Sequence, residues 1–350
     1  MAYEQYEDRI RLEKQTNEKV DRTSPFCDFI YYESSTTLGL RLAARVLKPE
    51  KPGYIVAGTH GWHMGIRGFK PMDHPLADNK YLRIEVDMRG RPYSEGDADC
   101  NGWELYDIID AIEYVRIHYA EYIVNPDIVY FEAGSGGGGN ALAIVGKFPD
   151  TFAAATSLCG ISDYALWYNQ DAVGEFRDEL DVWIGCSPAA NPMAYRSRSG
   201  LETVGNLCTS LYIVHGESDI RVPSEHSRRF VAKAAEAGKS RLVRYRELPG
   251  VGAQSHWDHA SAEMMGLIAY ESEENRRSHR LPVLLPASGT LTVAGYVFTR
   301  SFSLILDSID KVATLEYDMD KGMFELFCEL ECDYTLTVGR ERFIRKAIQV

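Results

Sequence analysis

Short apolar runs rich in Val, Ile, Tyr and Phe recur along the chain and alternate with segments in which apolar residues follow helical spacing. Strands are predicted for residues 27–34, 38–49, 53–58, 81–87, 127–133, 152–159, 210–216 and 241–248. Helices are predicted for residues 104–119, 140–148, 224–238 and 259–275. This alternation predicts the α/β class, with a doubly wound, mainly parallel sheet.

Residues 161–207 interrupt this rhythm with a long interval between two predicted strands. The interval is rich in aromatic residues and carries a helical pattern, which predicts a helical insertion. Long insertions of this kind often cover a binding site. A cap over a pocket is therefore expected, and a plain surface excursion is the alternative.

Beyond residue 280 the pattern changes to an apolar–polar alternation of period two, with turn residues between the runs. This period is typical of strands with one buried face. We therefore expect three parts: a polar N-terminal segment (1–26), an α/β domain (27–279) and a small antiparallel β unit (280–350).

Composition limits the classes of binding partner and the cellular compartment that can be expected. The 350 residues carry a formal net charge of -13, which argues against a general nucleic-acid or anionic-membrane binder. An apolar stretch of membrane-spanning length is absent from the sequence, and the charged N-terminus lacks the apolar core of a secretion signal. The seven cysteines are scattered, which indicates free thiols in a reducing compartment and predicts a cytoplasmic protein.

Ser135 lies in an unusual glycine cluster between a predicted strand and a predicted helix. Strand, small-residue turn and helix in this order are what a nucleophile elbow requires, because the serine occupies a strained backbone position. Ala133 replaces the first glycine of the usual G-x-S-x-G pattern and is still small. The Gly-Lys-Ser/Thr ending of a P-loop is missing. A dinucleotide fingerprint normally lies in the first strand–helix unit, and a linker does not fit between two apolar runs.

A serine nucleophile needs a base that is oriented by an acid. Asp219 follows one predicted strand and His256 follows the next, so both belong to the carboxyl edge of the sheet where such sites form. Glu217 is a weaker candidate for the acid. His259, which we place further into the following helix, is the rival base.

The oxyanion of an acyl-transfer transition state requires two converging N–H donors. The amide of Gly136, directly after the nucleophile, and that of Trp62, in the loop after an early strand, are the candidates. His60 and His63 have a spacing found in metal sites, but the sequence offers no third ligand, so we assign no metal. Arg89 is expected to support the loop at residues 87–97, with a substrate carboxylate as the alternative partner.

Together these segments make the chain resemble the α/β-hydrolase superfamily over residues 27–275. The motifs are His60-Gly61-Trp62, "DMRGRPYSEGD", the Ser135 elbow, "HGESDIRVP" and "LPGVGAQSHWDH". Within the superfamily they are similar to prolyl-oligopeptidase-type peptidases and carbohydrate acetyl esterases. The resemblance implies a Ser135–His256–Asp219 triad and oxyanion donors at Trp62 and Gly136.

The sequence departs from the pattern of these families in two places. Three residues separate Gly252 from His256, where the families place the histidine directly after glycine. The peptidases usually carry an N-terminal propeller, and the 26 polar residues at the start of this sequence cannot form one. The β unit at residues 280–350 fits neither family.

These observations predict a serine hydrolase that cleaves a carboxylic ester, such as an acylated sugar or another small ester, without a cofactor. A peptidase acting on short peptides is the alternative, and so is a hydrolase fold used as a lyase, transferase or non-catalytic binding protein. Aromatic residues that line a substrate pocket or form the core of the cap are expected at His63, Tyr164, Trp167, Tyr168 and Trp183. The β unit is a candidate surface for homo-oligomer formation or polymer binding.

Overall fold

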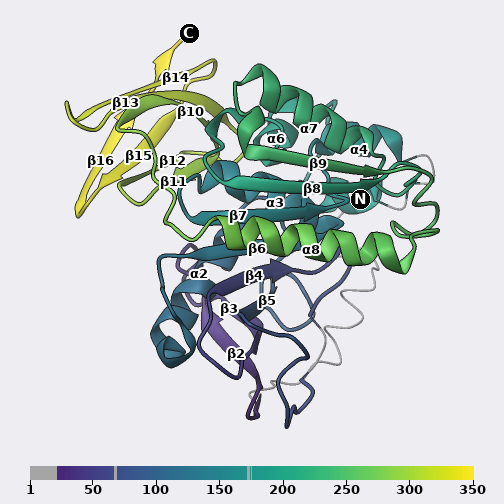
Figure 1. Cartoon of the computed structure of the whole chain (residues 1–350). Coiled ribbons are helices and arrows are strands. Elements are labelled where there is room, and N and C mark those ends of the chain that lie inside the picture. Colours follow the sequence, from purple (N-terminus) through teal and green to yellow (C-terminus); the bar gives the residue numbers. More distant parts are fainter. Residues whose placement is uncertain (1–21, 67–68, 172–173, 175) are drawn as a thin grey trace.

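The computed structural model describes residues 22–66, 69–171, 174 and 176–350. Most of the predicted N-terminal segment therefore lies outside the described residues. A nine-stranded sheet in the order β1-β2-β3-β5-β4-β6-β7-β8-β9 forms the centre of the molecule (Figure 1). Its strands are β1 (Arg22–Thr23), β2 (Cys27–Glu33), β3 (Arg41–Leu47), β4 (Ile55–Thr59), β5 (Leu82–Asp87), β6 (Val129–Gly134), β7 (Phe152–Leu158), β8 (Ser210–Gly216) and β9 (Val243–Leu248).

The sheet is parallel from β5 through β9 and antiparallel at the β1, β2 and β3 end. The parallel strands are apolar on both faces, as strands covered on both sides must be. In β8, Leu211 and Ile213 join the core on one face, whereas Tyr212 and Val214 pack on the other. The mainly parallel, doubly wound sheet predicted from the sequence is confirmed.

Helices cover the two faces unequally. The core on the first face includes residues of α2 (Glu104–His118), α3 (Gly136–Lys147) and α7 (Glu225–Glu236). Helix α8 (Ala262–Ser278) packs on the opposite face. Short 3-10 turns complete this part of the chain at η2 (Ala120–Tyr122) and η4 (Ser240–Leu242).

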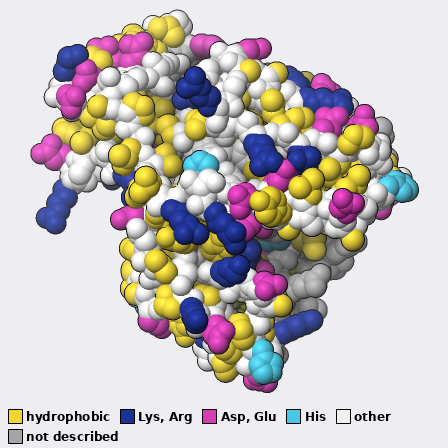
Figure 2. All heavy atoms as spheres, in the orientation of Figure 1, with side chains coloured by type: hydrophobic (Ala, Val, Ile, Leu, Met, Phe, Trp, Pro, Cys, Tyr) yellow, Lys and Arg dark blue, Asp and Glu magenta, His cyan; other side chains and the backbone are white. Residues whose placement is uncertain are grey.

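Paired charges join α8 to the sheet. Glu271 of α8 is 3% exposed and accepts hydrogen bonds from Arg246 and Tyr212, while Arg276 pairs with Glu132 of β6. Figure 2 shows basic side chains gathered over the region of α8 with acidic ones among them. Because these ions neutralise one another at a half-buried contact, the basic cluster is a structural feature of the helix–sheet junction.

The interval at residues 161–207 is helical, as predicted. It contains α4 (Tyr164–Gln170), α5 (Arg177–Trp183), α6 (Pro192–Arg198) and the 3-10 turn η3 (Val204–Asn206). Asp163 and Asn191 cap α4 and α6 by accepting backbone N–H groups with their side chains, which fixes where these short helices begin. The insertion shares a core with Trp62 and with Ala98 and Cys100.

The last part of the chain is a second, eight-stranded sheet in the order β16-β15-β12-β11-β10-β13-β14-β17. Its strands are β10 (Ser288–Ala294), β11 (Tyr296–Phe298), β12 (Phe302–Leu306), β13 (Val312–Asp318), β14 (Met323–Cys328), β15 (Asp333–Val338), β16 (Glu341–Lys346) and β17 (Ile348–Gln349). All neighbouring strands are antiparallel except β14 and β17. The sheet has a core of its own and lies beside the end of the large sheet's helical layer (Figure 1).

Buried polar contacts bind the second sheet to the α/β part. The ammonium of Lys147, at the end of α3, donates to the carbonyl of Ala294 at 2.7 Å. The hydroxyl of Tyr296 donates to the carbonyl of Gly102 at 2.7 Å, and the Tyr296 side chain belongs to the core of the α/β part. Asn206 exchanges two hydrogen bonds with the backbone of Thr292. The second sheet is therefore docked through its own buried side chains.

Candidate active site

Ser135 occupies a sharp turn between β6 and α3. Its backbone has φ 57° and ψ −122°, a conformation that L-residues rarely adopt, and its N–H donates to the carbonyl of Leu158 at 2.8 Å. The turn is too crowded for larger residues. A Cβ on Gly137 would lie 2.7 Å from Oγ1 of Thr59 and 2.8 Å from the Cβ of Ala133. Close packing, and not flexibility, explains the glycine cluster.

A continuous chain of hydrogen bonds joins Ser135, His256 and Asp219. The Ser135 hydroxyl lies 2.8 Å from Nε2 of His256, and Nδ1 of His256 lies 2.6 Å from a carboxylate oxygen of Asp219. Because the carboxylate can only accept, Nδ1 carries the proton and Nε2 is free to accept from the serine. Asp219 and His256 follow β8 and β9, whose carboxyl ends lie at the same edge of the sheet as the elbow.

The environment keeps Asp219 anionic. Its carboxylate is buried, and burial alone would raise its pKa. The contact with His215 and the hydrogen bond from His256 outweigh burial, and the pKa falls well below its usual value. The amides of Arg221 and Val222 donate to its other oxygen at 2.9 and 3.1 Å. The Asp219 carboxylate is therefore charged and held in one orientation.

His215, at the end of β8, is a part of this network that the sequence did not single out. It is fully buried, and Nε2 donates to the carbonyl of Val222 at 2.7 Å while Nδ1 lies 2.7 Å from the hydroxyl of Ser227. Nε2 also lies 3.6 Å from Asp219. The only sequence signal was a histidine four residues before an acid in a loop, which many proteins have without such a contact.

The rival acid and base do not join the chain of hydrogen bonds. Glu217 accepts from the amide of Gly250 at 2.9 Å. His259 is exposed, with φ 68°, in the turn before α8; the expectation that it lies within the helix is wrong, because Ser261 caps the helix there. The three residues before His256 form a tight turn in which the amide of Ala253 donates to Ser255.

The backbone of Trp62, in the loop after β4, touches the backbone of Gly136. A Cβ on Gly136 would lie 2.6 Å from the Trp62 nitrogen and 2.7 Å from its Cα. Within the described residues, neither of the two amides donates to another protein group. Two adjacent, unused N–H donors beside Ser135 form an arrangement suited to an oxyanion.

The aromatic residues of the insertion pack behind Trp62. Its ring lies 4.6 Å from Trp183, 4.9 Å from Trp167 and 5.8 Å from Tyr164, centroid to centroid, and these three side chains are buried. They form the core between the insertion and the loop, which is the packing role that the sequence left as an alternative to substrate contact. His63 and Tyr168 are only half-buried and remain the accessible members of the predicted set.

The remaining candidates have structural surroundings. Burial and the charge of Arg91 lower the pKa of His60 to about 3, so its ring is neutral. Arg89 forms a buried ion pair with Asp107 of α2, which agrees with a role in supporting its loop.

One group of possible metal ligands exists within the described residues. The ligand atoms of Cys159, His215 and Asp219 lie within 4.8 Å of one another and are buried. Both ring nitrogens of His215 and both oxygens of Asp219 already take part in the hydrogen bonds above. We therefore treat the group as part of the acid's support.

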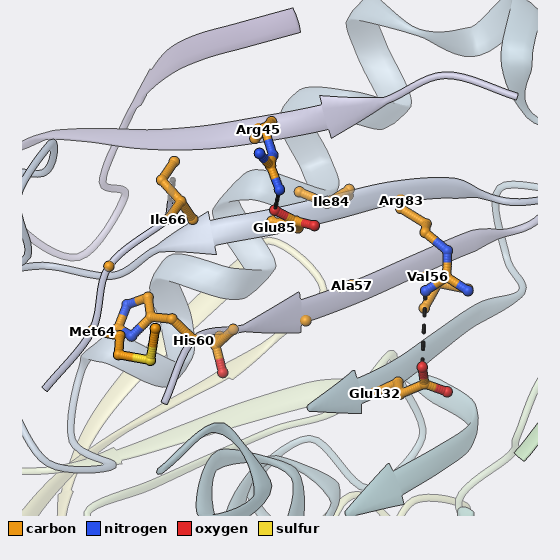
Figure 3. Close-up of a pocket in the computed structure, with 13 residues that line it drawn as sticks. Arg45, Val56, Ala57, His60, Met64, Ile66, Arg83, Ile84, Glu85 and Glu132 are labelled. Atoms are coloured by element: carbon orange, nitrogen blue, oxygen red, sulfur yellow. Dashed lines mark hydrogen bonds and ion pairs between the residues drawn. The ribbon is translucent and has the colours of Figure 1, made fainter. Parts of the chain in front are cut away.

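A hollow of about 390 Å³ lies on the face of the sheet where Glu132 pairs with Arg276 of α8, and Figure 3 shows the residues that line it. In the close-up, Arg45 points toward Glu85 and Arg83 toward Glu132, so its charged walls are internally paired. Ser135, Asp219 and His256 do not line it. The hollow therefore borders the loop after β4 but does not include these three residues.

Within the described residues, no helix has the length and apolar character needed to cross a membrane. The sequence matches the family model of the prolyl oligopeptidase family over residues 69–257, which includes Ser135, Asp219 and His256.

Curated relatives include both peptidases and esterases. Dipeptidyl peptidase family member 6 of Caenorhabditis elegans is 27% identical over 181 residues, covering 47% of this chain and 23% of that protein. Esterase LipQ of Mycobacterium tuberculosis is 24% identical over 218 residues, covering 58% of this chain and 50% of that protein. The chain thus spans between about a quarter and a half of the length of these relatives.

The fold is similar to solved peptidase structures. Pyrococcus horikoshii acylaminoacyl peptidase superposes with a TM-score of 0.58 and 21% identity, covering 74% of this chain and 42% of that one. A puromycin-hydrolyzing peptidase of Mycobacterium tuberculosis gives 0.55 and 22%, covering 72% and 39%. The α/β-hydrolase fold is therefore confirmed, and with the family match above, the chain belongs to the prolyl oligopeptidase family of serine hydrolases.

Proposed function

We propose that this serine hydrolase cleaves a carboxylic ester through Ser135, His256 and Asp219, with the amides of Trp62 and Gly136 as oxyanion donors. The observation that carries the proposal is the unbroken hydrogen-bond chain from Ser135 through His256 to a buried, anionic Asp219. The side chain of His256 is 17% exposed, so solvent and substrate reach the base.

The geometry supports acyl transfer in two steps. His256 Nε2 takes the hydroxyl proton as Ser135 Oγ attacks the ester carbonyl, and the two amides donate to the resulting oxyanion. His256 then gives this proton to the departing alkoxide, which leaves as an alcohol, and Ser135 is acylated. Water then loses a proton to His256 as it attacks the acyl group, and His256 returns that proton to Ser135 Oγ as the acid departs. Asp219 stays ionised throughout and stabilises the imidazolium.

An ester is the favoured substrate over a peptide, with short peptides as the second candidate. Both classes occur among the curated relatives described above, because LipQ is named an esterase and the worm protein a dipeptidyl peptidase. An alkoxide also leaves more readily than an amine, so the cleavage of a small ester has a lower barrier and needs less stabilisation from the site. His63 and Tyr168 are the candidate substrate contacts.

Labelling with a fluorophosphonate tests the nucleophile, with p-nitrophenyl acetate hydrolysis measured in parallel. The wild type should label and turn over, Ser135→Ala should do neither, and Ser301→Ala, which removes an exposed serine of the second sheet, should match the wild type. Loss of the nucleophile should lower kcat by several orders of magnitude. A wild type that neither labels nor turns over any activated ester would favour the use of this fold for another purpose.

Substrates that share one acyl group separate esterase from peptidase. N-acetyl-phenylalanine p-nitrophenyl ester and the corresponding p-nitroanilide differ only in the bond that is broken. We expect measurable kcat/KM on the ester and no release of p-nitroaniline above that seen with Ser135→Ala. Turnover of the anilide that is lost in Ser135→Ala would identify the chain as a peptidase, even if the activated ester is cleaved faster.

A further inference from the structure

Helix α5 of the insertion places one carboxylate directly on the oxyanion loop. Glu179 is 3% exposed, and one of its oxygens accepts from the indole Nε1 of Trp62 at 2.5 Å. Its other oxygen lies 2.8 Å from Nδ1 of His63. Consecutive side chains of the loop are thus held by the two oxygens of a single residue that is more than a hundred positions away in the sequence.

The loop is also fixed by packing. The Trp62 side chain is 7% exposed and lies against Trp183 of the same helix, and the His63 ring stacks on Phe176 at 5.3 Å. Aromatic packing of this kind favours several ring positions of similar energy, whereas a hydrogen bond to Nε1 selects one of them. Glu179 therefore fixes the orientation of the Trp62 ring, which aromatic packing alone would leave among several positions.

The orientation of the Trp62 ring matters because the backbone amide of the same residue is the oxyanion donor proposed above. The Trp62 nitrogen is in van der Waals contact with the backbone of Gly136, so it cannot move inward. It can only move away from the site, and the anchor at Nε1 opposes this movement. Donors that are fixed before the reaction are worth more than donors that must reorganise during it.

We propose that Glu179 is a positioning residue: it holds Trp62 so that the Trp62 amide points at the developing oxyanion, and thereby makes the insertion part of the catalytic apparatus. The inference rests on the proposed function, because it assigns Glu179 a role in that same acyl transfer.

Two variants of Glu179 and one control test the inference. Glu179→Leu keeps a side chain of similar bulk and leaves Trp62 Nε1 without an acceptor. Glu179→Gln keeps an acceptor for Trp62, and the His63 ring can change tautomer to accept from the new amide. Asp178→Asn removes a charge from the exposed neighbouring position of the same helix and should behave like the wild type.

Each variant is measured per active site, with active sites counted by the burst of fluorophosphonate labelling. For Glu179→Leu we expect kcat on p-nitrophenyl acetate to fall by about 10- to 100-fold, somewhat less than the loss of a whole oxyanion donor. KM should stay within about threefold, because the ground-state ester does not use the oxyanion site. The inhibition constant of an aryl trifluoromethyl ketone, whose adduct with the serine is an oxyanion, should rise in parallel with the loss in kcat. Glu179→Gln should recover most of both.

Three results would overturn the inference. The first is that Glu179→Leu has the same kcat and the same inhibition constant per active site as the wild type. The second is a loss explained entirely by fewer titratable sites or a lower melting temperature, which indicates a structural role alone. The third is a wild type that behaves like Ser135→Ala in labelling and turnover. Only this third result would also remove the proposed function, so the two failures are distinguishable.

Discussion

Gly136 is the single residue on which the geometry of the proposed oxyanion site depends most closely. It belongs to the first turn of α3, and its Cα faces the Trp62 backbone with no room for a methyl group. A side chain here cannot be absorbed by rotation, because the atoms in its way are main-chain atoms. The absence of a side chain at position 136 is therefore required by the proposed site as well as by the fold.

We predict that Gly136→Ala pushes the Trp62 loop outward and lowers kcat on p-nitrophenyl acetate by about tenfold or more, since one donor leaves its place. Overpacking should also destabilise the fold by about 1–3 kcal/mol. Steady-state kinetics and urea denaturation measure the two effects separately.

Gly266→Ala is the matched control for this prediction. Gly266 lies within α8 and has open space where a Cβ would be, so alanine there should leave kcat unchanged and raise stability by about 0.5–1 kcal/mol. If Gly136→Ala turned over like the wild type, the contact with Trp62 would not be needed for catalysis.

The residues of the candidate site were predictable from the sequence to different degrees. Ser135, Asp219 and His256 could be named because each follows a strand at one edge of a parallel sheet, which makes them neighbours by topology alone. His215 and Glu179 could not, because their roles depend on tertiary contacts that no local pattern encodes. The buried aromatic residues were ambiguous for a related reason: composition tells that Trp183 packs, but not which surface it packs against.

At the scale of elements, the period of the apolar positions and the length of each run were enough to predict regular strands and helices. The eight predicted strands and four predicted helices are present with shifts of a few residues at their ends. The start of α3 is the clearest shift: it begins at Gly136 and includes all four glycines, because close packing against the neighbouring backbone outweighs the low helix propensity of glycine. Ser224 lies at the start of α7, and its hydroxyl donates to the carbonyl of Glu217 instead of capping the helix, whereas Gly238 follows the helix with φ 71°.

The junction between α3 and the second sheet contains a buried base. Lys147 is 1% exposed, and its ammonium lies 4.4 Å from the centre of the Tyr296 ring. Burial, together with the charge of Arg198, lowers its pKa from 10.5 to about 7. The other groups that face it, which raise the pKa by less, are Asp99, Cys100 and Asp310.

This lowered pKa predicts how stability changes with pH. Between pH 7 and 10.5 the unfolded chain holds a proton on Lys147 that the folded chain has released, so stability rises with pH across this window. Below pH 7 the lysine is protonated in both states, and its contribution stops changing.

We therefore expect the free energy of unfolding from urea denaturation to rise more steeply between pH 7 and 9 in the wild type than in Lys147→Met. The difference in slope should approach about 1.4 kcal/mol per pH unit. Lys233→Met, at an exposed position of α7, should retain the wild-type slope. Parallel curves for the wild type and Lys147→Met would show that the buried amine keeps an ordinary pKa.

At the scale of the whole molecule, the second sheet is an integral part of the fold. The change of sequence pattern near residue 280 predicts where this sheet begins but not how it docks, because a pattern records local structure only. Tyr296 nevertheless lies in the core of the α/β part, where its ring stacks on Trp103 at 4.9 Å. Arg198 of the insertion also pairs with Asp310 of the second sheet at 2.5 Å. The insertion thus contacts the Trp62 loop on one side and the second sheet on the other.

A chain that ends at residue 279 should accordingly fail to give an active monomer, because it uncovers Lys147 and removes Tyr296 from the core. Size-exclusion chromatography and p-nitrophenyl acetate hydrolysis would detect aggregation and loss of turnover. A chain that ends at residue 347 loses only the exposed β17 and should remain folded and active. An active monomer of residues 1–279 would contradict this view of the junction.

The backbone of Ser135 has a consequence for the thermodynamics of the entire chain. A residue with a Cβ at φ 57° and ψ −122° costs about 1–3 kcal/mol, which the rest of the fold must offset. Ser135→Gly and Ser135→Ala both lack the hydroxyl, yet only glycine is relaxed in this conformation. Ser135→Gly should therefore unfold at the higher urea concentration, with a margin of about 1 kcal/mol after the greater entropy of unfolded glycine is deducted. Selection for turnover and selection for stability thus favour different residues at position 135.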